Sequence, residues 1–215
     1  MKAVLFDLDG TIFDTWKLYI ESYLLTLHKK FQKRISMREL IELRPISEFR
    51  ILQNAVGDEW KEYYQDFLLH YRALHETHFG GIYEGIPELL SELEKTNLLL
   101  GVISGKSQGA YEIHKEFCNL KTYPVEVLDD HVVEPKPNPE GLLIALEKLQ
   151  VSPGDAIYVG DSTMDFEAAR SAGTDFLGAG WSKNEKEKKD FLEKCPGAKL
   201  LEHPKQVWDY IQNFE

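Results

Sequence analysis

Cysteine is scarce in this chain of 215 residues, which contains only Cys118 and Cys195. The two lie far apart and form no C-x-x-C pair, so we expect neither a disulfide framework nor structural zinc, and a reducing cytoplasm fits best. No apolar run approaches the roughly 18 residues of a membrane span. The first residues also lack the apolar stretch and cleavage site of a signal peptide, so we expect no membrane association.

Basic residues are outnumbered: 25 Lys and Arg stand against 36 Asp and Glu, for a formal net charge of −11. Such a chain lacks the basic footprint that nucleic acids and anionic lipids recognise, so neither is an expected partner. The seven histidines show no metal-ligand spacing. The lysine-rich stretch Lys183–Lys189 carries interleaved glutamates and predicts a solvated helix face.

Hydrophobic residues make up 43% of the chain, enough for a sizeable core. The apolar run Ala3–Asp7 is typical of a buried parallel strand. After residue 80, strand-like and helical segments alternate, which predicts an α/β fold with a parallel sheet covered on both faces. We expect strands over 98–103, 125–128, 156–160, 175–178 and 199–201, and helices beginning at Pro87 and over 108–117, 142–149, 166–172 and 206–213.

Residues 16–79 differ from the rest of the chain because strand-like runs are scarce there. Their Leu, Tyr, Phe, Glu and Lys residues recur at helical spacing, which predicts three or four helices. Pro45 and Gly57 mark breaks between these helices. An all-helical block inserted after the first strand implies a cap on the sheet.

Two acidic clusters follow predicted strands. Asp7 and Asp9, before Gly10, point the same way while the strand stays extended. Asp161 and Asp165 follow a later strand and open a helix. Taken separately, the clusters fit a turn and an N-cap. The carboxyl ends of parallel strands meet at one edge of a sheet, so we expect the four carboxylates to converge there and to need a cation. Oxygen ligands without His or Cys favour Mg²⁺.

Two further segments follow strand ends. Ser104–Ser107 places a hydroxyl and backbone amides at a helix start, which is a natural phosphate seat. The spacing between Gly101 and Gly105 is too short for a nucleotide P-loop. The segment Glu134–Pro139, taken alone, reads as a rigid proline loop with an exposed Lys136.

In order and spacing, these motifs resemble the haloacid dehalogenase superfamily of phosphohydrolases and, within it, the phosphoglycolate-phosphatase-like group. The resemblance covers nearly the whole chain. It rests on four motifs: Asp7-x-Asp9-Gly10-Thr11, Ser104, Lys136-Pro137, and Gly160-Asp161 with Asp165.

The resemblance implies a Mg²⁺-dependent phosphatase acting on a small phosphorylated metabolite. Asp7 would be the nucleophile that forms an aspartyl phosphate. Asp9 would protonate the leaving oxygen and then deprotonate the hydrolytic water. Mg²⁺ would bind Asp7, the backbone carbonyl of Asp9, and Asp161. Asp165 would complete the metal site through water or by orienting a neighbour.

The resemblance also assigns substrate contacts and domains. Ser104 and Lys136 would act as catalytic residues that bind the phosphoryl oxygens, with Thr11 and Gly105 contributing to substrate binding. The implied fold is a Rossmann-like parallel sheet with helices on both faces, formed by residues 1–15 and 80–215. Residues 16–79 would form the inserted helical cap.

Several points depart from the family pattern or stay open. Ser104-Gly105 replaces the frequent Thr-Asn, and the cap turn carries Arg44 and Arg50, which either reach a substrate anion or are surface residues. A phosphomutase of the β-phosphoglucomutase type and a pyrophosphatase of the same group are the alternative enzymes. A non-catalytic binding protein is the alternative outside enzymes. Monomer and dimer stay equally open.

Overall fold

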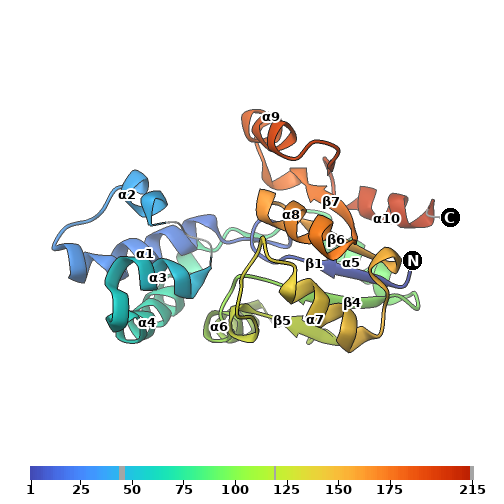
Figure 1. The fold of residues 1–215 in the computed structure, drawn as a ribbon. Coiled ribbons are helices and arrows are strands. Elements are labelled where there is room, and N and C mark those ends of the chain that lie inside the picture. The colour runs from blue at the N-terminus through green and yellow to red at the C-terminus, as the bar shows by residue number, and fades with distance from the viewer. Residues whose placement is uncertain (44–46, 119, 214–215) are drawn as a thin grey trace. The chain divides into compact units, whose positions relative to one another are not determined.

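The computed structural model describes residues 1–43, 47–118 and 120–213, and the chain forms two compact units (Figure 1). The sheet unit comprises Met1–Asp14, Gly81–Ser104 and Thr122–Glu215, and the helical unit comprises Thr15–Gly80 and Gly105–Lys121. The helical unit therefore extends beyond the predicted insert, because α6 (Gln108–Cys118) packs against α4 (Trp60–His78).

The sheet unit contains six parallel strands in the order β5-β4-β1-β6-β7-β8. This confirms the predicted Rossmann-like sheet. Every residue of β1 is fully buried, so this central strand is covered on both faces. The strands are β1 (Ala3–Phe6), β4 (Leu99–Ile103), β5 (Val125–Val127), β6 (Ala156–Gly160), β7 (Asp175–Ala179) and β8 (Lys199–Leu201).

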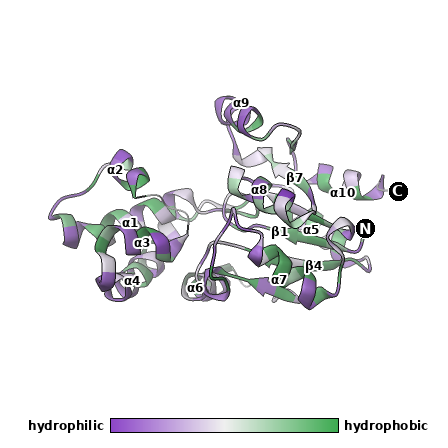
Figure 2. Ribbon diagram, in the orientation of Figure 1, coloured by the Kyte–Doolittle hydropathy of each residue, from purple (hydrophilic) through white to green (hydrophobic). Residues whose placement is uncertain are grey.

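Helices pack around this sheet. α7 contacts β4 and β5, α8 contacts β6 and β7, and α5 packs against α10. Figure 2 shows hydrophobic residues on the central strands and hydrophilic residues along α9, as its lysine and glutamate pattern predicts. The helices are α5 (Ile86–Glu94), α7 (Glu140–Leu149), α8 (Thr163–Ala172), α9 (Glu185–Lys194) and α10 (Lys205–Gln212).

A small antiparallel pair, β2 (Phe13–Asp14) and β3 (Gly81–Ile82), joins the two chain segments that flank the insert. Sequence patterns did not predict it, because two residues are too few for a period of two to be visible. The pair brings the two ends of the insert together within the sheet unit.

In the described parts of residues 16–79 (16–43 and 47–79) the helical unit has four α-helices, as predicted, and α6 follows later in the chain. α1, α3 and α6 contact α4, and Phe67 and Tyr71 of α4 are fully buried. Gly57 ends α3 as expected, whereas Pro45 lies outside the described residues. The helices are α1 (Trp16–Phe31), α2 (Met37–Glu42), α3 (Glu48–Val56), α4 (Trp60–His78) and α6 (Gln108–Cys118).

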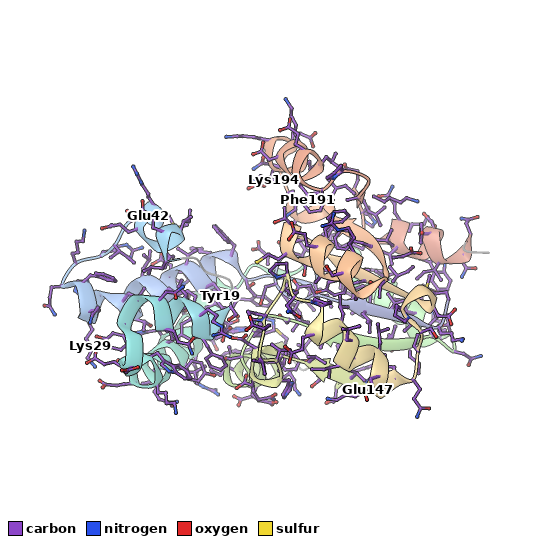
Figure 3. The ribbon with its side chains drawn as sticks, in the orientation of Figure 1. Tyr19, Lys29, Glu42, Glu147, Phe191 and Lys194 are labelled. Atoms are coloured by element: carbon purple, nitrogen blue, oxygen red, sulfur yellow. The ribbon has the colours of Figure 1, made fainter. Side chains whose placement is uncertain are left out.

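Charged side chains such as Lys29 and Glu147 lie on the outside of their units (Figure 3). Among the described residues, no helix combines the length and the apolar character that crossing a membrane would require.

Candidate active site

Asp7 lies directly after β1, at the carboxyl end of the central strand. Its backbone N–H donates to the carbonyl of Val159 in β6 (2.8 Å), which extends the sheet register to this residue. The side chain is 6% exposed. Asp7 is thus a nearly buried carboxylate held at the edge where the central strands end.

The turn after Asp7 brings the first acidic cluster against the second. Gly10 has a φ of +82°, and a Cβ at this position would lie 2.6 Å from Cγ of Asp161. Only glycine meets both conditions without strain. The indole N–H of Trp181, in the 3₁₀ turn Gly180–Ser182 after β7, also holds this turn, because it donates to the Thr11 carbonyl (2.9 Å).

Lys136 joins the first and second acidic clusters. Its ammonium group donates to Oδ1 of Asp7 (2.7 Å), to Oδ1 of Asp165 (2.6 Å) and to the hydroxyl of Tyr158 (3.1 Å). The Lys136 side chain is 14% exposed, which corrects the simple interpretation of an exposed lysine on a proline loop. One ammonium group therefore forms ion pairs with two buried carboxylates.

Asp165 has two structural tasks. Its Oδ2 accepts from the N–H and the hydroxyl of Ser162, forming a capping box at the start of α8. Its Oδ1 accepts from Lys136 and from the Tyr158 hydroxyl (2.9 Å). Gly160 permits this arrangement, because a Cβ there would lie 2.6 Å from Cγ of Asp165. The N-cap interpretation of this cluster is thus confirmed for Ser162, and Asp165 in addition contacts Lys136.

Asp161 forms an ion pair with a second lysine, Lys183. Lys183, which follows the 3₁₀ turn Gly180–Ser182, donates to Oδ2 of Asp161 at 2.9 Å, and its side chain is 14% exposed. The sequence placed Lys183 at the start of a solvated, lysine-rich helix face. The structure corrects this for Lys183, because α9 begins only at Glu185.

Burial and charge act together on these groups. Burial raises the pKa of Asp7 well above its ordinary value, and nearby carboxylates add to this against the opposing Lys136. For Lys136, burial acts to lower the pKa, but Asp165 and Asp7 raise it well above the usual lysine value. Burial also acts to raise the pKa of Asp165, yet Lys136 and Ser162 hold it below its ordinary value. Lys136 and Asp165 therefore form the charged pair. Asp7 is the group of the three whose negative charge the burial opposes most effectively.

The donor set fits a divalent, oxygen-preferring cation. Asp7, Asp161 and Asp165 each offer a carboxylate oxygen, and these oxygens lie within 4.8 Å of one another. Burial is also the main cause that raises the pKa of Asp161. These three carboxylates face two lysine ammonium groups, Lys136 and Lys183, which leaves one negative charge in excess when all five groups are ionised. A cation such as Mg²⁺ matches both the charge and the ligand chemistry.

The remaining predicted contacts lie in different surroundings. Ser104 follows β4 directly and is buried, and its N–H donates to the carbonyl of Val127 (2.9 Å). Thr11 is fully buried, and its hydroxyl has no hydrogen-bond partner among the described residues. Gly105 belongs to the helical unit, where its carbonyl accepts from the N–H of Glu48 (3.3 Å).

The structure does not test the role predicted for Arg44 and Arg50. Arg44 lies outside the described residues. Arg50 lies on α3, half-buried, with Nη1 donating to Oε1 of Gln53 (3.4 Å). Their assignment as substrate contacts stays a prediction.

Tyr158 and Lys183 are the site residues that sequence reasoning missed. Tyr158 was interpreted only as part of a buried strand, although a tyrosine near the end of such a strand needs a partner for its hydroxyl. That requirement is the signal that would have found it. Its hydroxyl bonds Asp165, Lys136 and the carbonyl of Ile103 (3.0 Å).

Comparison with known proteins shows the family of the chain. Residues 4–179 match the family described as haloacid dehalogenase-like hydrolases. A pyrophosphatase, PpaX, from Bacillus velezensis is 34% identical over 187 residues, covering 85% of this chain and 84% of that protein. An N-acetylmuramic acid 6-phosphate phosphatase from Pseudomonas aeruginosa is 33% identical over 191 residues, covering 81% and 79%.

Solved structures share the fold. CbbY from Rhodobacter sphaeroides, in complex with phosphate, superposes with a TM-score of 0.81 at 23% identity and 96% coverage of both chains. A protein described as a putative β-phosphoglucomutase from Thermotoga maritima has a TM-score of 0.73, 26% identity and full coverage of both chains. The sheet and the helical insert are thus found together in other proteins.

Proposed function

Because the chain belongs to the family of haloacid dehalogenase-like hydrolases, we propose that it is a Mg²⁺-dependent phosphatase. It hydrolyses a small-molecule phosphomonoester through an aspartyl phosphate on Asp7. The observation that carries this proposal is the ammonium group of Lys136 shared between buried Asp7 and Asp165. Phosphoryl transfer depends on positioning and neutralised charge, and this contact supplies both. The phosphatases among the relatives support the reaction class.

Asp7 is the nucleophile in this proposal. Lys136 holds its Oδ1, and we assign the attack on phosphorus to Oδ2. As the new O–P bond forms, the bond to the leaving oxygen breaks, and Asp9 gives that oxygen its proton. Asp9 then takes a proton from the water that hydrolyses the aspartyl phosphate, which regenerates both residues.

Asp7, Asp161 and the backbone carbonyl of Asp9 would hold Mg²⁺ directly. Both oxygens of Asp165 already accept hydrogen bonds from the chain, so Asp165 orients Lys136 or acts through water. The bound ion neutralises charge on the phosphoryl group and the excess charge of the carboxylates. Burial without that ion keeps the pKa of Asp7 high and its carboxylate a poor nucleophile.

Ser104 and Lys136 bind the phosphoryl oxygens in this proposal, with Thr11 and Gly105 completing the seat. The buried, unpartnered hydroxyl of Thr11 supports its role, because a buried hydroxyl without a partner is costly. The helical insert, residues 16–79, is proposed as a cap on the sheet unit, with α6 belonging to the helical unit and not to the core. Arg44 and Arg50 are its candidate contacts to a second anionic group on the substrate.

A pyrophosphatase is the second candidate, because the Bacillus velezensis relative carries that name at 34% identity. Inorganic pyrophosphate presents the same phosphoryl group with a phosphate as its leaving group. The chemistry proposed for Asp7 and Asp9 is unchanged in that case. The two candidates therefore differ only in what the rest of the pocket accepts.

The test is a phosphate-release screen of the purified full chain over sugar phosphates, amino-sugar phosphates, phosphoglycolate and inorganic pyrophosphate, with Mg²⁺ or with chelator. We expect release that requires Mg²⁺ and is abolished in Asp7→Asn. Conversion of one sugar phosphate into its isomer without phosphate release would favour a phosphomutase. Full release in chelator would refute the metal assignment, and binding of phosphorylated metabolites without turnover would favour a non-catalytic protein.

A further inference from the structure

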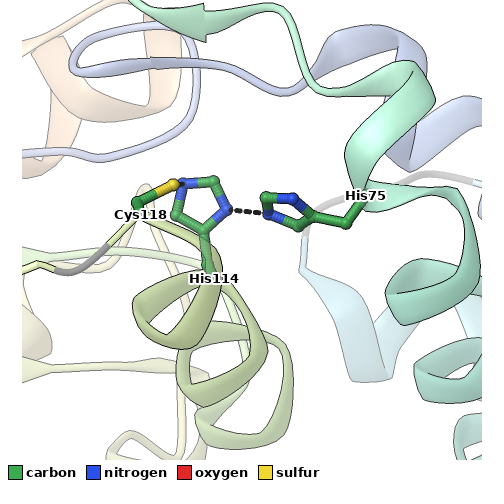
Figure 4. A group of neighbouring side chains, drawn as sticks. All are labelled: His75, His114 and Cys118. Carbon is green, nitrogen blue, oxygen red and sulfur yellow. Dashed lines mark hydrogen bonds between the residues drawn. The ribbon is translucent and has the colours of Figure 1, made fainter.

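A second group of metal-ligating side chains lies inside the helical unit, between α4 and α6. Nε2 of His75 and Nδ1 of His114 are 2.9 Å apart, and Sγ of Cys118 lies 3.6 Å from Nε2 of His114 (Figure 4). One ligand atom from each residue can be chosen so that all three lie within 4.8 Å of one another. Neither the acidic site nor the proposed reaction uses these residues.

The helices hold the three side chains in place. His114 and Cys118 are four residues apart on α6 and so share one face of the helix. His75 reaches them from the last turn of α4. His75 is 2% exposed and His114 is fully buried. Phe117 stacks on the His75 ring at 4.2 Å, and Phe79 packs edge-on against His114 at 4.7 Å. Aromatic rings thus shield both imidazoles from water.

We propose that His75, His114 and Cys118 bind a zinc ion. Imidazole nitrogen and thiolate sulfur are the donors that Zn²⁺ selects, and three protein ligands leave a fourth position open. The His114 ring stands between the other two side chains, with one nitrogen toward each. A turn of that ring directs one nitrogen toward the ion, and neighbouring donors around zinc lie about 3.3 to 3.8 Å apart, given the usual bond lengths.

The charged groups buried in the helical unit are also compatible with a bound zinc ion. Lys106 is a buried cation of this unit, and its ammonium group donates to the hydroxyls of Tyr19 (2.7 Å) and Tyr71 (3.0 Å). Tyr19 in turn donates to the buried carboxylate of Glu48. The negative charge of Glu48 therefore partly offsets the positive charge of Lys106, to which the Tyr19 hydroxyl connects it. Binding as a thiolate, Cys118 offsets part of the charge of the ion.

The ligand atoms of the two sites would then select different metal ions. The acidic site of the sheet unit offers oxygen only, whereas the cluster of the helical unit offers nitrogen and sulfur. Hard Mg²⁺ prefers the first, and borderline-soft Zn²⁺ prefers the second. Zinc in the helical unit is independent of whether the acidic site hydrolyses phosphate.

The experiment titrates chelator-treated full-length protein with Co²⁺ and then Zn²⁺, in saturating Mg²⁺ to occupy the acidic site. We expect one Co²⁺ per chain, with a thiolate-to-cobalt charge-transfer absorption that one equivalent of Zn²⁺ removes. Cys118→Ser should abolish the absorption, and His114→Gln should weaken zinc binding by more than about 100-fold, since even second-shell losses reach that size. Cys195→Ser is the matched control and should bind like the unchanged protein.

Absence of the absorption band in the unchanged protein would refute the proposal without any variant. Persistence of the band in Cys118→Ser, or its loss in Cys195→Ser, would also refute it. Circular dichroism of each variant identifies a folding failure. If Cys118→Ser fails to fold, mild alkylation of the folded protein replaces it: zinc must protect Cys118, and no protection would overturn the assignment.

Discussion

Tyr158→Phe is the substitution that most directly tests how the site is held together. The change removes one buried hydroxyl and leaves the ring in the core. That hydroxyl contacts Lys136 (3.1 Å), Oδ1 of Asp165 (2.9 Å) and the carbonyl of Ile103 (3.0 Å). Two of these three partners are the charged pair on which the proposed chemistry depends.

The expected loss of stability and of kcat in Tyr158→Phe follows from the contacts that remain around Lys136 and Asp165. Hydrogen bonds to charged groups contribute about 1.5 to 3 kcal/mol each, and the direct contact between Lys136 and Asp165 at 2.6 Å persists. We therefore expect the free energy of unfolding to fall by about 2 kcal/mol. Lys136 loses one of three anchors, so kcat should fall about 10-fold, equivalent to about 1.4 kcal/mol of barrier.

Urea unfolding followed by circular dichroism measures the first quantity, and phosphate release at saturating substrate and Mg²⁺ measures the second. Tyr63→Phe is the control, because Tyr63 is a buried tyrosine of α4 in the helical unit. Unchanged stability together with unchanged kcat in Tyr158→Phe would refute the view that this hydroxyl orients Lys136 and Asp165.

The remaining predictions concern charge. Asp7→Asn should leave no phosphoenzyme, whereas Asp9→Asn should slow turnover by about 10² to 10⁴-fold and spare activated aryl phosphates, as comparison of the two substrate classes shows. Lys183→Met should change the Mg²⁺ concentration for half-maximal binding, measured by calorimetry, more than it changes kcat, because its contact is to a proposed metal ligand. Burial lowers the pKa of His114 to about 2. In chelator-treated protein the contribution of His114 to stability should therefore fall by about 1.4 kcal/mol per pH unit below about pH 6.5, since only the unfolded state takes up that proton. His75, whose pKa burial lowers to about 4, adds to the slope above about pH 4. His114→Gln should flatten the slope in unfolding titrations. Arg50→Ala should lower kcat/KM by about 10-fold or more for a substrate with a second anionic group, relative to an aryl phosphate.

The sheet and the acidic site were largely predictable, because their signals are local. The apolar runs that became β1 and β6 are followed directly by Asp7 and Asp161, and parallel strands end at one edge. Adjacent pairing of β1 with β6 therefore brings the acids together. Lys136 was predicted as a site residue only from the order of the family motifs, because hydrophobic periodicity does not indicate where a loop lysine lies.

What was missed depends on contacts between residues distant in sequence. Tyr158 and Lys183 each join the site through one polar atom, and neighbouring residues do not reveal such a contact. His75 and His114 meet because α6 packs on α4, whereas sequence order assigned α6 to the core. The spacing of His114 and Cys118 was visible, but a helical pair needs its third ligand before it indicates a metal.

The hydrogen bond from the Trp181 indole to the Thr11 carbonyl places an intrinsic fluorophore next to the acidic site. The indole touches the turn that carries Asp9, and two residues later Lys183 touches Asp161. A ligand that shifts either acid changes the polarity around a fluorophore already in place. Emission of the unlabelled chain should therefore follow occupancy of the acidic site, and Trp181→Phe should silence the signal among the four tryptophans.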